Sequence, residues 1–114
     1  MHMRHYRRVR TTLHVRYDTP ADKIEAYIEA IKQLVLDSPH TRKDRYRIRL
    51  DDFSDFGVQI LINFFLDVAN TKDEQVERQQ LLMGILKLAE SMDIQFATPA
   101  LVPVADNPQS QDGG

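Results

Sequence analysis

The chain of 114 residues contains no cysteine. This absence excludes disulfide bonds, thiol catalysis and thiolate metal ligands. The chain also has no long hydrophobic run: its longest apolar stretch, VQILINFFLDV, is interrupted by Gln59, Asn63 and Asp67 and is too short and too polar to span a bilayer. The first residues, MHMRHYRR, lack the apolar core of a signal peptide. A formal net charge of −2 leaves no global positive excess to attract nucleic acid or anionic lipid.

The composition, 42% hydrophobic and 28% charged, is typical of one globular domain. The Met-His-Met start resembles a cloning junction, so we expect residues 1–6 to be linker residues ahead of a domain over residues 7–97. The remaining residues, 98–114, are expected to form an extended segment and then a disordered tail, because ADNPQSQDGG is polar and has no apolar periodicity.

Three segments alternate between apolar and polar residues, which predicts strands with one buried and one wet face. The expected buried positions are Val9, Thr11, Leu13, Val15 and Tyr17 in the first segment, Tyr46, Ile48 and Leu50 in the second, and Val58, Ile60, Ile62, Phe64, Leu66 and Val68 in the third. Gly57, in the turn DDFSDFG before the third strand, is available for a backbone angle that other residues avoid.

Two segments have apolar residues at helical spacing. In the first, Thr19 is the expected cap, with Pro20 at the first helical position, and Asp22 completes a capping box. This helix should end near Asp37, before Pro39. Its apolar stripe is Ile24, Tyr27, Ile28, Ile31, Leu34 and Val35.

Thr71 and Glu74 form a second capping-box pattern, which starts a helix that runs to about Met92. Its apolar stripe is Leu82, Ile85, Ala89 and Met92, with Leu81 and Leu88 beside it. Gly84 inside this helix is unfavourable by about 1 kcal/mol relative to alanine, so we expect close packing there.

The predicted order βαββα favours an α+β fold of ferredoxin-like topology, an antiparallel sheet with two helices on one face. Right-handed crossovers place the first and third strands side by side, and the hairpin places the second beside the third. The third strand is therefore expected at the centre, with its second face on the side away from the helices.

That second face is predicted to be basic, with Arg8, Arg10, Arg16, Arg45, Arg47 and Arg49. An open basic sheet face resembles an RNA-recognition module. However, the central strand has only Phe65 and no run that matches the expected aromatic motif, so nucleic acid is not the favoured partner. Leu61 and Phe65 are apolar residues in the middle of this face. Either the stems of neighbouring arginines cover them, or they form a docking surface for another domain or subunit.

No pattern in the sequence supports catalysis, a metal site or a cofactor. Asp51, Asp52 and Asp55 at one turn do not match a calcium loop, and turn chemistry explains them. The histidines show no metal-ligand spacing. The serines lack the context of a nucleophile, and no glycine-rich phosphate loop is present. We therefore predict that the protein is not an enzyme.

Three stretches together resemble one known family. RRVRTTLHVRYDTPADKIEAYIEAIKQLVLDSPH, RIRLDDFSDFGVQILINFFLDV and KDEQVERQQLLMGILKLAESMDIQFATPA are similar, in order and spacing, to the C-terminal cytoplasmic domain of the small-conductance mechanosensitive channel (MscS) family. The likeness covers about Arg7 to Pro99. The stretch IQFATPALVPV departs from the family pattern, because it lacks the first proline of that pattern and is broken by Pro103.

The resemblance implies a membrane ion channel that opens under bilayer tension and releases osmolytes during hypo-osmotic shock. It implies a homoheptamer in the cell membrane, with this domain in a hollow vestibule on the cytoplasmic side. The basic strands would then pack against neighbours or face an ion-filled chamber. By itself the chain is expected to be monomeric or weakly associated. The alternative is a free-standing ferredoxin-like domain that binds RNA or a regulatory ligand.

Overall fold

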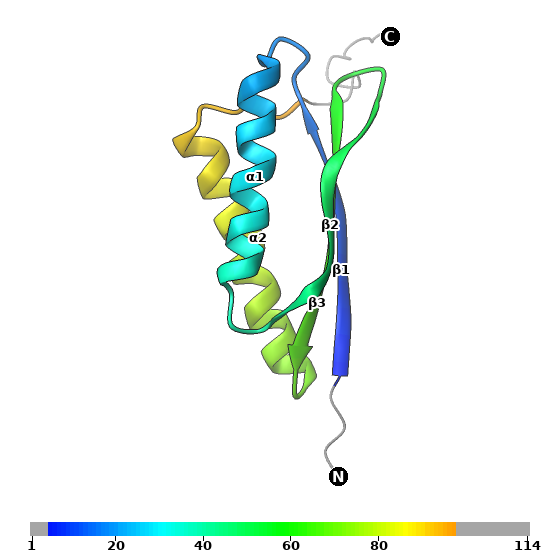
Figure 1. Ribbon diagram of the computed structural model, residues 1–114, viewed down its shortest axis with the longest axis vertical. Helices are drawn as coiled ribbons and strands as arrows, with labels where there is room; N and C mark the ends of the chain where they lie inside the picture. The colour runs from blue at the N-terminus through cyan, green and yellow to red at the C-terminus, as the bar shows by residue number, and fades with distance from the viewer. Residues whose placement is uncertain (1–4, 98–114) are drawn as a thin grey trace, which may run out of the picture.

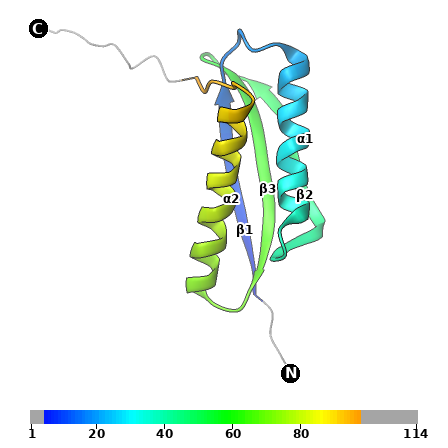
Figure 2. The ribbon, with the colours of Figure 1, turned by 90° about the vertical axis from the view of Figure 1, so that its left-hand side faces the viewer.

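The computed structural model describes residues 5–97, which form a three-stranded sheet covered on one face by two helices (Figures 1 and 2). The elements in chain order are β1 (His5–Val15), α1 (Ala21–Asp37), β2 (Thr41–Phe53), β3 (Val58–Val68) and α2 (Thr71–Ser91). The predicted α+β class and the order βαββα are confirmed. β1 begins within the predicted linker 1–6, and the expected tail, residues 98–114, lies outside the described residues.

The strand order is β1-β3-β2, with both pairs antiparallel, so the third strand is central as predicted. The chain after α2 returns to the free edge of β1. There Val15 and Phe96 form an isolated antiparallel bridge, the Arg16 amide donates to the Gln95 carbonyl at 3.1 Å, and the Ala97 amide donates to the His14 carbonyl at 2.7 Å. This segment occupies the edge at which a ferredoxin-like sheet adds its fourth strand.

The core lies between the sheet and the two helices. All six predicted inner-face residues of β3 are buried, at 6% exposure or less. The helix residues that meet them recur every four positions, which is the spacing of one helical face. They are Tyr27, Ile31 and Val35 on α1, and Leu81, Ile85 and Ala89 on α2.

Three residues predicted for the core are exposed. Tyr17 lies beyond the end of β1 and is exposed, and its hydroxyl donates to the Ser54 carbonyl. Tyr46 and Leu50 on β2 are also exposed, and only Ile48 between them is buried. β2 is an edge strand whose pairing with β3 shifts on both sides of Ile48, so its inward positions extend past the cover of the helices.

Both predicted capping boxes are wrong by one residue. Pro20 is the N-cap of α1; it has no side-chain cap, and its carbonyl accepts the first helical hydrogen bonds, so Thr19 lies outside the helix. Asn70, rather than Thr71, caps α2, and its Oδ1 accepts from the Asp73 amide at 2.9 Å. Asparagine is at least as good an N-cap as threonine, which explains why the helix starts one residue earlier.

The C-terminus of α2 closes with a Schellman arrangement of hydrogen bonds. The Ile94 amide donates to the Ala89 carbonyl at 2.8 Å, and the Asp93 amide donates to the Glu90 carbonyl at 3.2 Å. Asp93 has φ 57°, the left-handed conformation that this motif needs. The turn brings Ile94 back into the core and aims the following residues at the edge of β1.

Gly57 and Gly84, the glycines among the described residues, both lie where an added Cβ would be crowded. A Cβ atom on Gly57 would lie 2.7 Å from the Val15 carbonyl oxygen and 2.9 Å from the Ala97 Cβ. The prediction of a special backbone angle at Gly57 is therefore wrong, since close approach alone requires glycine there. A Cβ on Gly84 would lie 2.9 Å from Leu34 Cδ2, which confirms the close packing predicted for α2 against α1.

Candidate functional site

The face of the sheet away from the helices, here called the outer sheet face, collects the polar positions of all three strands. Residues that pair directly across antiparallel strands share a face. The middle outward residues of β3 are Leu61, Asn63 and Phe65, with Gln59 and Asp67 on either side of them. Asn63 pairs with Arg10 on β1 and Arg47 on β2. The register therefore places the residue at the centre of the face between two arginines.

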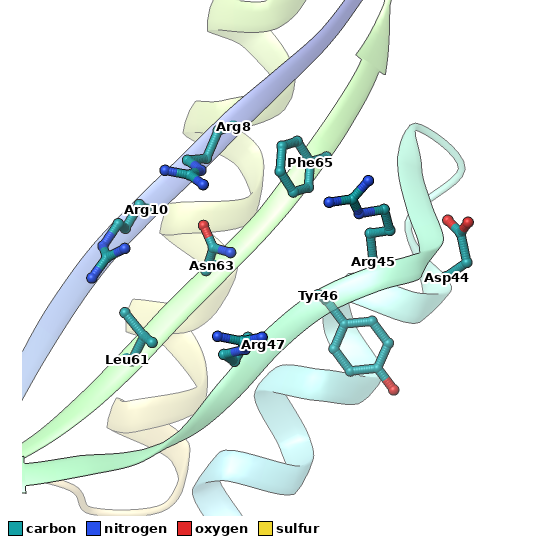
Figure 3. Close-up of a pocket in the computed structure, with 9 residues that line it drawn as sticks. All are labelled: Arg8, Arg10, Asp44, Arg45, Tyr46, Arg47, Leu61, Asn63 and Phe65. Carbon is teal, nitrogen blue, oxygen red and sulfur yellow. The ribbon is translucent and has the colours of Figure 1, made fainter.

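A depression of about 340 Å³ opens on the outer sheet face (Figure 3). Figure 3 shows Arg8 and Arg10 along one side of it and Arg45 and Arg47 along the other, with Asn63 and Phe65 between them. We call this site the arginine depression. Its lining residues are Arg8, Arg10, Asp44, Arg45, Tyr46, Arg47, Leu61, Asn63 and Phe65.

The four arginines of the depression are not neutralised by salt bridges. Within residues 5–97, none of them has a carboxylate oxygen within the 4.0 Å of an ion pair. The ion pairs of this part of the chain involve other basic residues. A group of guanidinium ions without local counter-ions produces a positive potential that attracts anions.

Two arginines of the predicted basic sheet face, Arg16 and Arg49, do not line the arginine depression. Arg16 lies past the end of β1, where its guanidinium forms an ion pair with Asp18 at 2.8 Å and a hydrogen bond to the Gln95 side chain at 3.4 Å. Arg49 pairs across the sheet with Leu61, but its guanidinium lies 3.5 Å from Asp51. Both aspartates stand two residues after their arginine, a spacing at which strand residues share a face, so the sequence contained the signal for these two pairs.

The two apolar residues of the outer sheet face are largely covered by their neighbours. Leu61 is only 5% exposed, although it points away from the helices. Phe65 is half-buried, and the guanidinium carbons of Arg8 and Arg45 lie 5.9 and 5.4 Å from its ring centroid. These distances allow cation–π attraction. The geometry favours coverage by arginine side chains, and docking of a neighbour on Leu61 and Phe65 stays a prediction.

Asn63 has an unsatisfied polar atom. Its Oδ1 is buried and has no hydrogen-bond partner. Buried side-chain oxygens in folded proteins are almost always paired, so each exception calls for an explanation. Asn63 lines the depression between Arg10 and Arg47, so this unpaired acceptor belongs to a residue that has arginines on both sides.

At one end of the depression, the carboxylate of Asp44 already accepts hydrogen bonds from an arginine outside the depression. The Arg42 guanidinium donates to both oxygens of Asp44, at 2.9 and 3.1 Å. This side-chain hydrogen bond lowers the pKa of the Asp44 carboxyl below its usual value. Arg42 also lies over the Tyr6 ring, 4.4 Å from its centroid. Asp44 therefore does little to neutralise the arginines beside it.

The aspartate turn shows no ligand-binding geometry. No group of three or more His, Asp or Glu side chains is arranged to hold a metal ion in the part of the chain that the structure describes. Ser54 organises the turn, because its hydroxyl accepts from the Gly57 amide at 3.1 Å and donates to the Gly57 carbonyl at 2.9 Å. Asp52 accepts from the Phe53 amide, and Asp51 pairs with Arg49.

Sequence reasoning identified the basic face but not the role of Asn63. The alternation in β3 placed Asn63 on the outer face, between Leu61 and Phe65, and a polar residue there needed no explanation. Its significance depends on the register, which sets Arg10 and Arg47 on either side. The register follows from the hairpin and from the crossover, which the spacing of the sequence does not specify to the residue.

The fold and the outer sheet face together describe an α+β module with a ferredoxin-like layout and one basic sheet face. A family model, "Mechanosensitive ion channel MscS, C-terminal", matches residues 9–96. The chain therefore belongs to the MscS family of mechanosensitive ion channels, as its sequence resemblance indicated. The match covers all five elements apart from the first four residues of β1.

Relatives in distant organisms agree with this assignment. The chain is 27% identical over 95 residues to the large-conductance mechanosensitive channel MscMJLR of Methanocaldococcus jannaschii, which covers 81% of this chain and 26% of the relative. It is 21% identical over 106 residues to the uncharacterised MscS family protein YhdY of Bacillus subtilis, covering 93% of this chain and 29% of the relative. The chain thus spans under a third of the length of these relatives.

The fold also occurs in a solved channel. The cryo-EM structure of Arabidopsis thaliana MSL1 matches with a TM-score of 0.73 at 14% identity, over 82% of this chain and 34% of that one. In residues 5–97, neither helix is both long and apolar enough to cross a membrane.

Proposed function

We propose that this chain forms the C-terminal cytoplasmic vestibule domain of an MscS-type channel that releases osmolytes on hypo-osmotic shock. The family match over residues 9–96 is the observation that supports this role. The parent protein would be a homoheptamer in the cell membrane, and this domain a structural and assembly module on its cytoplasmic side. In this proposal the domain performs no catalysis and needs no cofactor.

The experiment is an osmotic downshock assay with the longer parent protein that this proposal implies. A bacterial strain without its own mechanosensitive channels is transformed with the parent gene and moved from high to low osmolarity. Survival well above that of the empty vector supports the proposal. Parent protein that reaches the membrane and neither protects cells nor gives tension-activated currents in patches contradicts it.

The assembly role is tested by removing residues 9–96 from the parent. A structural module should be required for the oligomer, so the truncated parent should lose its ring on native gels of detergent extracts. A matched control replaces Lys87 with glutamine on α2. An unchanged oligomer after truncation would show that this domain does not contribute to assembly.

A further inference from the structure

We propose that the arginine depression binds a nucleoside phosphate. In this site the guanidinium groups around the depression hold the phosphate oxygens, and Asn63 Oδ1 accepts a hydrogen bond from the sugar or the base. The proposal goes beyond the channel assignment and does not depend on it. It rests on three features of the outer sheet face.

The first feature is the arrangement of positive charge. Adjacent strands lie about 4.8 Å apart, so Arg10 and Arg47, which flank the central Asn63, start about 10 Å apart on either side of it. Guanidinium groups match phosphate oxygens with paired N–H donors, a fit that a point charge such as lysine lacks. The described residues supply no ion-pair partner for these two arginines, and both arginines line the depression.

The acidic groups near the depression do not cancel this charge. Asp44 is held by both donors of Arg42. Asp67 lies one outward position beyond Phe65, opposite Tyr6 and toward the Arg42 end, and Asp51 is paired with Arg49 at the other end. The whole chain has a net charge of −2. Anion binding here would therefore be a property of one local site and not of the overall charge.

The second feature is the unpaired acceptor. Asn63 Oδ1 is buried without a hydrogen-bond donor, an unfavourable state that a bound donor would relieve. Inorganic phosphate keeps a proton near neutral pH, so it can also donate, but its only donors are on the oxygens that the arginines would hold. Ribose hydroxyls and the amino groups of adenine, guanine or cytosine are donors set apart from the phosphate oxygens. The combination of arginines with a vacant acceptor therefore favours a nucleoside phosphate over inorganic phosphate.

The third feature is the partly exposed aromatic ring. Phe65 lies beside Asn63 in the depression, with Arg8 and Arg45 on either side of it (Figure 3). Flat bases stack on aromatic rings and on guanidinium planes. The volume of about 340 Å³ falls in the range of small-molecule sites, which begins near about 300 Å³. A mononucleotide is thus of the right size and shape.

The test is calorimetric titration of the whole chain with ATP and with tripolyphosphate at low salt. Wild-type protein should bind ATP at least tenfold more tightly than tripolyphosphate. The double variant Arg10→Gln/Arg47→Gln should lose at least tenfold in affinity for ATP. The matched control, Arg78→Gln/Lys87→Gln, removes the same charge from α2 on the other layer and should stay within twofold of wild type.

The variant Asn63→Leu tests the contact to the nucleoside separately from the contacts to the phosphate. It should weaken ATP binding several-fold and leave tripolyphosphate binding unchanged. Equal affinity of wild type for the two ligands would overturn the role of Asn63. An equal loss in the α2 control, or no binding of ATP at millimolar concentration, would overturn the site itself. Circular dichroism of each variant confirms that it is folded.

A free nucleotide and an RNA strand would both present a nucleoside phosphate to this site. A titration with single-stranded octa-adenylate distinguishes these sources. Binding tighter than that of ATP, with an affinity that falls steeply with salt and is lost in Arg10→Gln/Arg47→Gln, assigns the site to a strand. Binding no tighter than that of ATP assigns it to a free nucleotide. NMR shifts on ATP addition outside the outer sheet face would contradict both.

Discussion

Two buried polar side-chain atoms in this protein differ in whether they have a hydrogen-bond partner. Tyr27 is fully buried against α2, and its hydroxyl donates to the Ile85 carbonyl at 3.0 Å. Asn63 Oδ1, on the other side of the sheet, has no donor. A buried polar atom adds little net stability when it is paired and destabilises the fold when it is not. We therefore expect tyrosine at position 27 to serve the fold and asparagine at position 63 to serve a ligand.

Tyr27 makes stability depend on pH in the alkaline range. Burial raises its pKa from 10.0 to about 12, because the charged phenolate is poorly solvated inside the protein. The folded state then binds the proton more tightly than the unfolded state. The contribution of Tyr27 is therefore complete below pH 10 and is lost as the pH rises toward 12. Urea melts between pH 8 and pH 12 should show this fall.

Tyr27→Phe tests the assignment of that pH dependence. The variant should lose about 1 kcal/mol of unfolding free energy near neutral pH, the usual value of one hydrogen bond. It should also show a shallower decline between pH 10 and pH 12 than wild type. Tyr46→Phe, at an exposed position of β2, is the matched control and should change neither quantity. Identical alkaline profiles for wild type and Tyr27→Phe would refute the role of Tyr27.

Phe64 and Phe65 are adjacent on β3 and face opposite sides of the sheet. Phe65→Asp should leave the chain folded, because the new carboxylate would lie among Arg8 and Arg45 on the open face. We expect a loss of less than about 2 kcal/mol from the half-buried ring. Phe64→Asp should unfold the chain, since Phe64 is fully buried in the core. Circular dichroism and urea melts check both.

The same substitution tests docking in the parent protein. If Leu61 and Phe65 contact a neighbouring domain or subunit there, Phe65→Asp would bury an unpaired charge and impair ring assembly or protection against downshock. If the Phe65→Asp parent still protects cells fully against downshock, the docking prediction is wrong. That result would leave the coverage by arginine side chains as the complete explanation of these two apolar residues.

At the scale of elements, close backbone approach decides where glycine is required. Gly57 lies at the start of β3, where the end of β1 and the segment after α2 converge. Gly84 lies where α2 crosses α1. Both positions lack space for a Cβ, but the obstacles differ. At Gly57 one obstacle is a backbone carbonyl, whereas at Gly84 it is the end of the Leu34 side chain.

Gly57→Ala should therefore destabilise the protein more than Gly84→Ala. The first substitution forces a backbone shift, for which we expect a loss of about 1–3 kcal/mol. The second requires only a movement of Leu34, and alanine regains about 1 kcal/mol of helix propensity. Its net change should stay within about 1 kcal/mol. Urea melts of the two variants compare them directly, and the reverse order would show that this account of the packing is wrong.

At the scale of the whole molecule, the chain is a small two-layer unit with limited means of self-association. Association costs several kcal/mol in lost rigid-body freedom, and stable interfaces bury about 1,200–2,000 Å². The exposed large apolar residues of the described structure form small groups on separate elements, none of them a large patch. They are Val76, Met83 and Leu86 on one face of α2, Leu50 and Phe53 on β2, and the tyrosines Tyr6, Tyr17 and Tyr46.

We therefore expect this 114-residue chain to be monomeric or weakly associated at micromolar concentration. Light scattering coupled to size exclusion should give a mass near 13.3 kDa. A sharp sevenfold mass would contradict the prediction and would mean that this domain alone holds the heptamer proposed for the parent. Repeating the measurement at high salt separates contacts made through the arginines from apolar contacts, because salt weakens only the former.

The sequence by itself determined the kind and order of the elements, the identity of the core face of β3 and the family. Those features depend on local periodicity: period two buries one face of a strand, and spacing of three and four buries one stripe of a helix. The end of α1 near Asp37 followed from Pro39 in the same local way.

Tertiary structure alone decided which predicted residues became core and which arginines became a site. Tyr46 and Leu50 have the pattern of core residues but lie on an edge strand with shifted pairing. Arg16 and Arg49 each have an aspartate two residues further on, so their ion pairs are local. Burial, and the grouping of the other four arginines around Asn63, depend on residues distant in the chain. Periodicity reports only which way a side chain points, whereas the register of β1, β3 and β2 decides what it meets there.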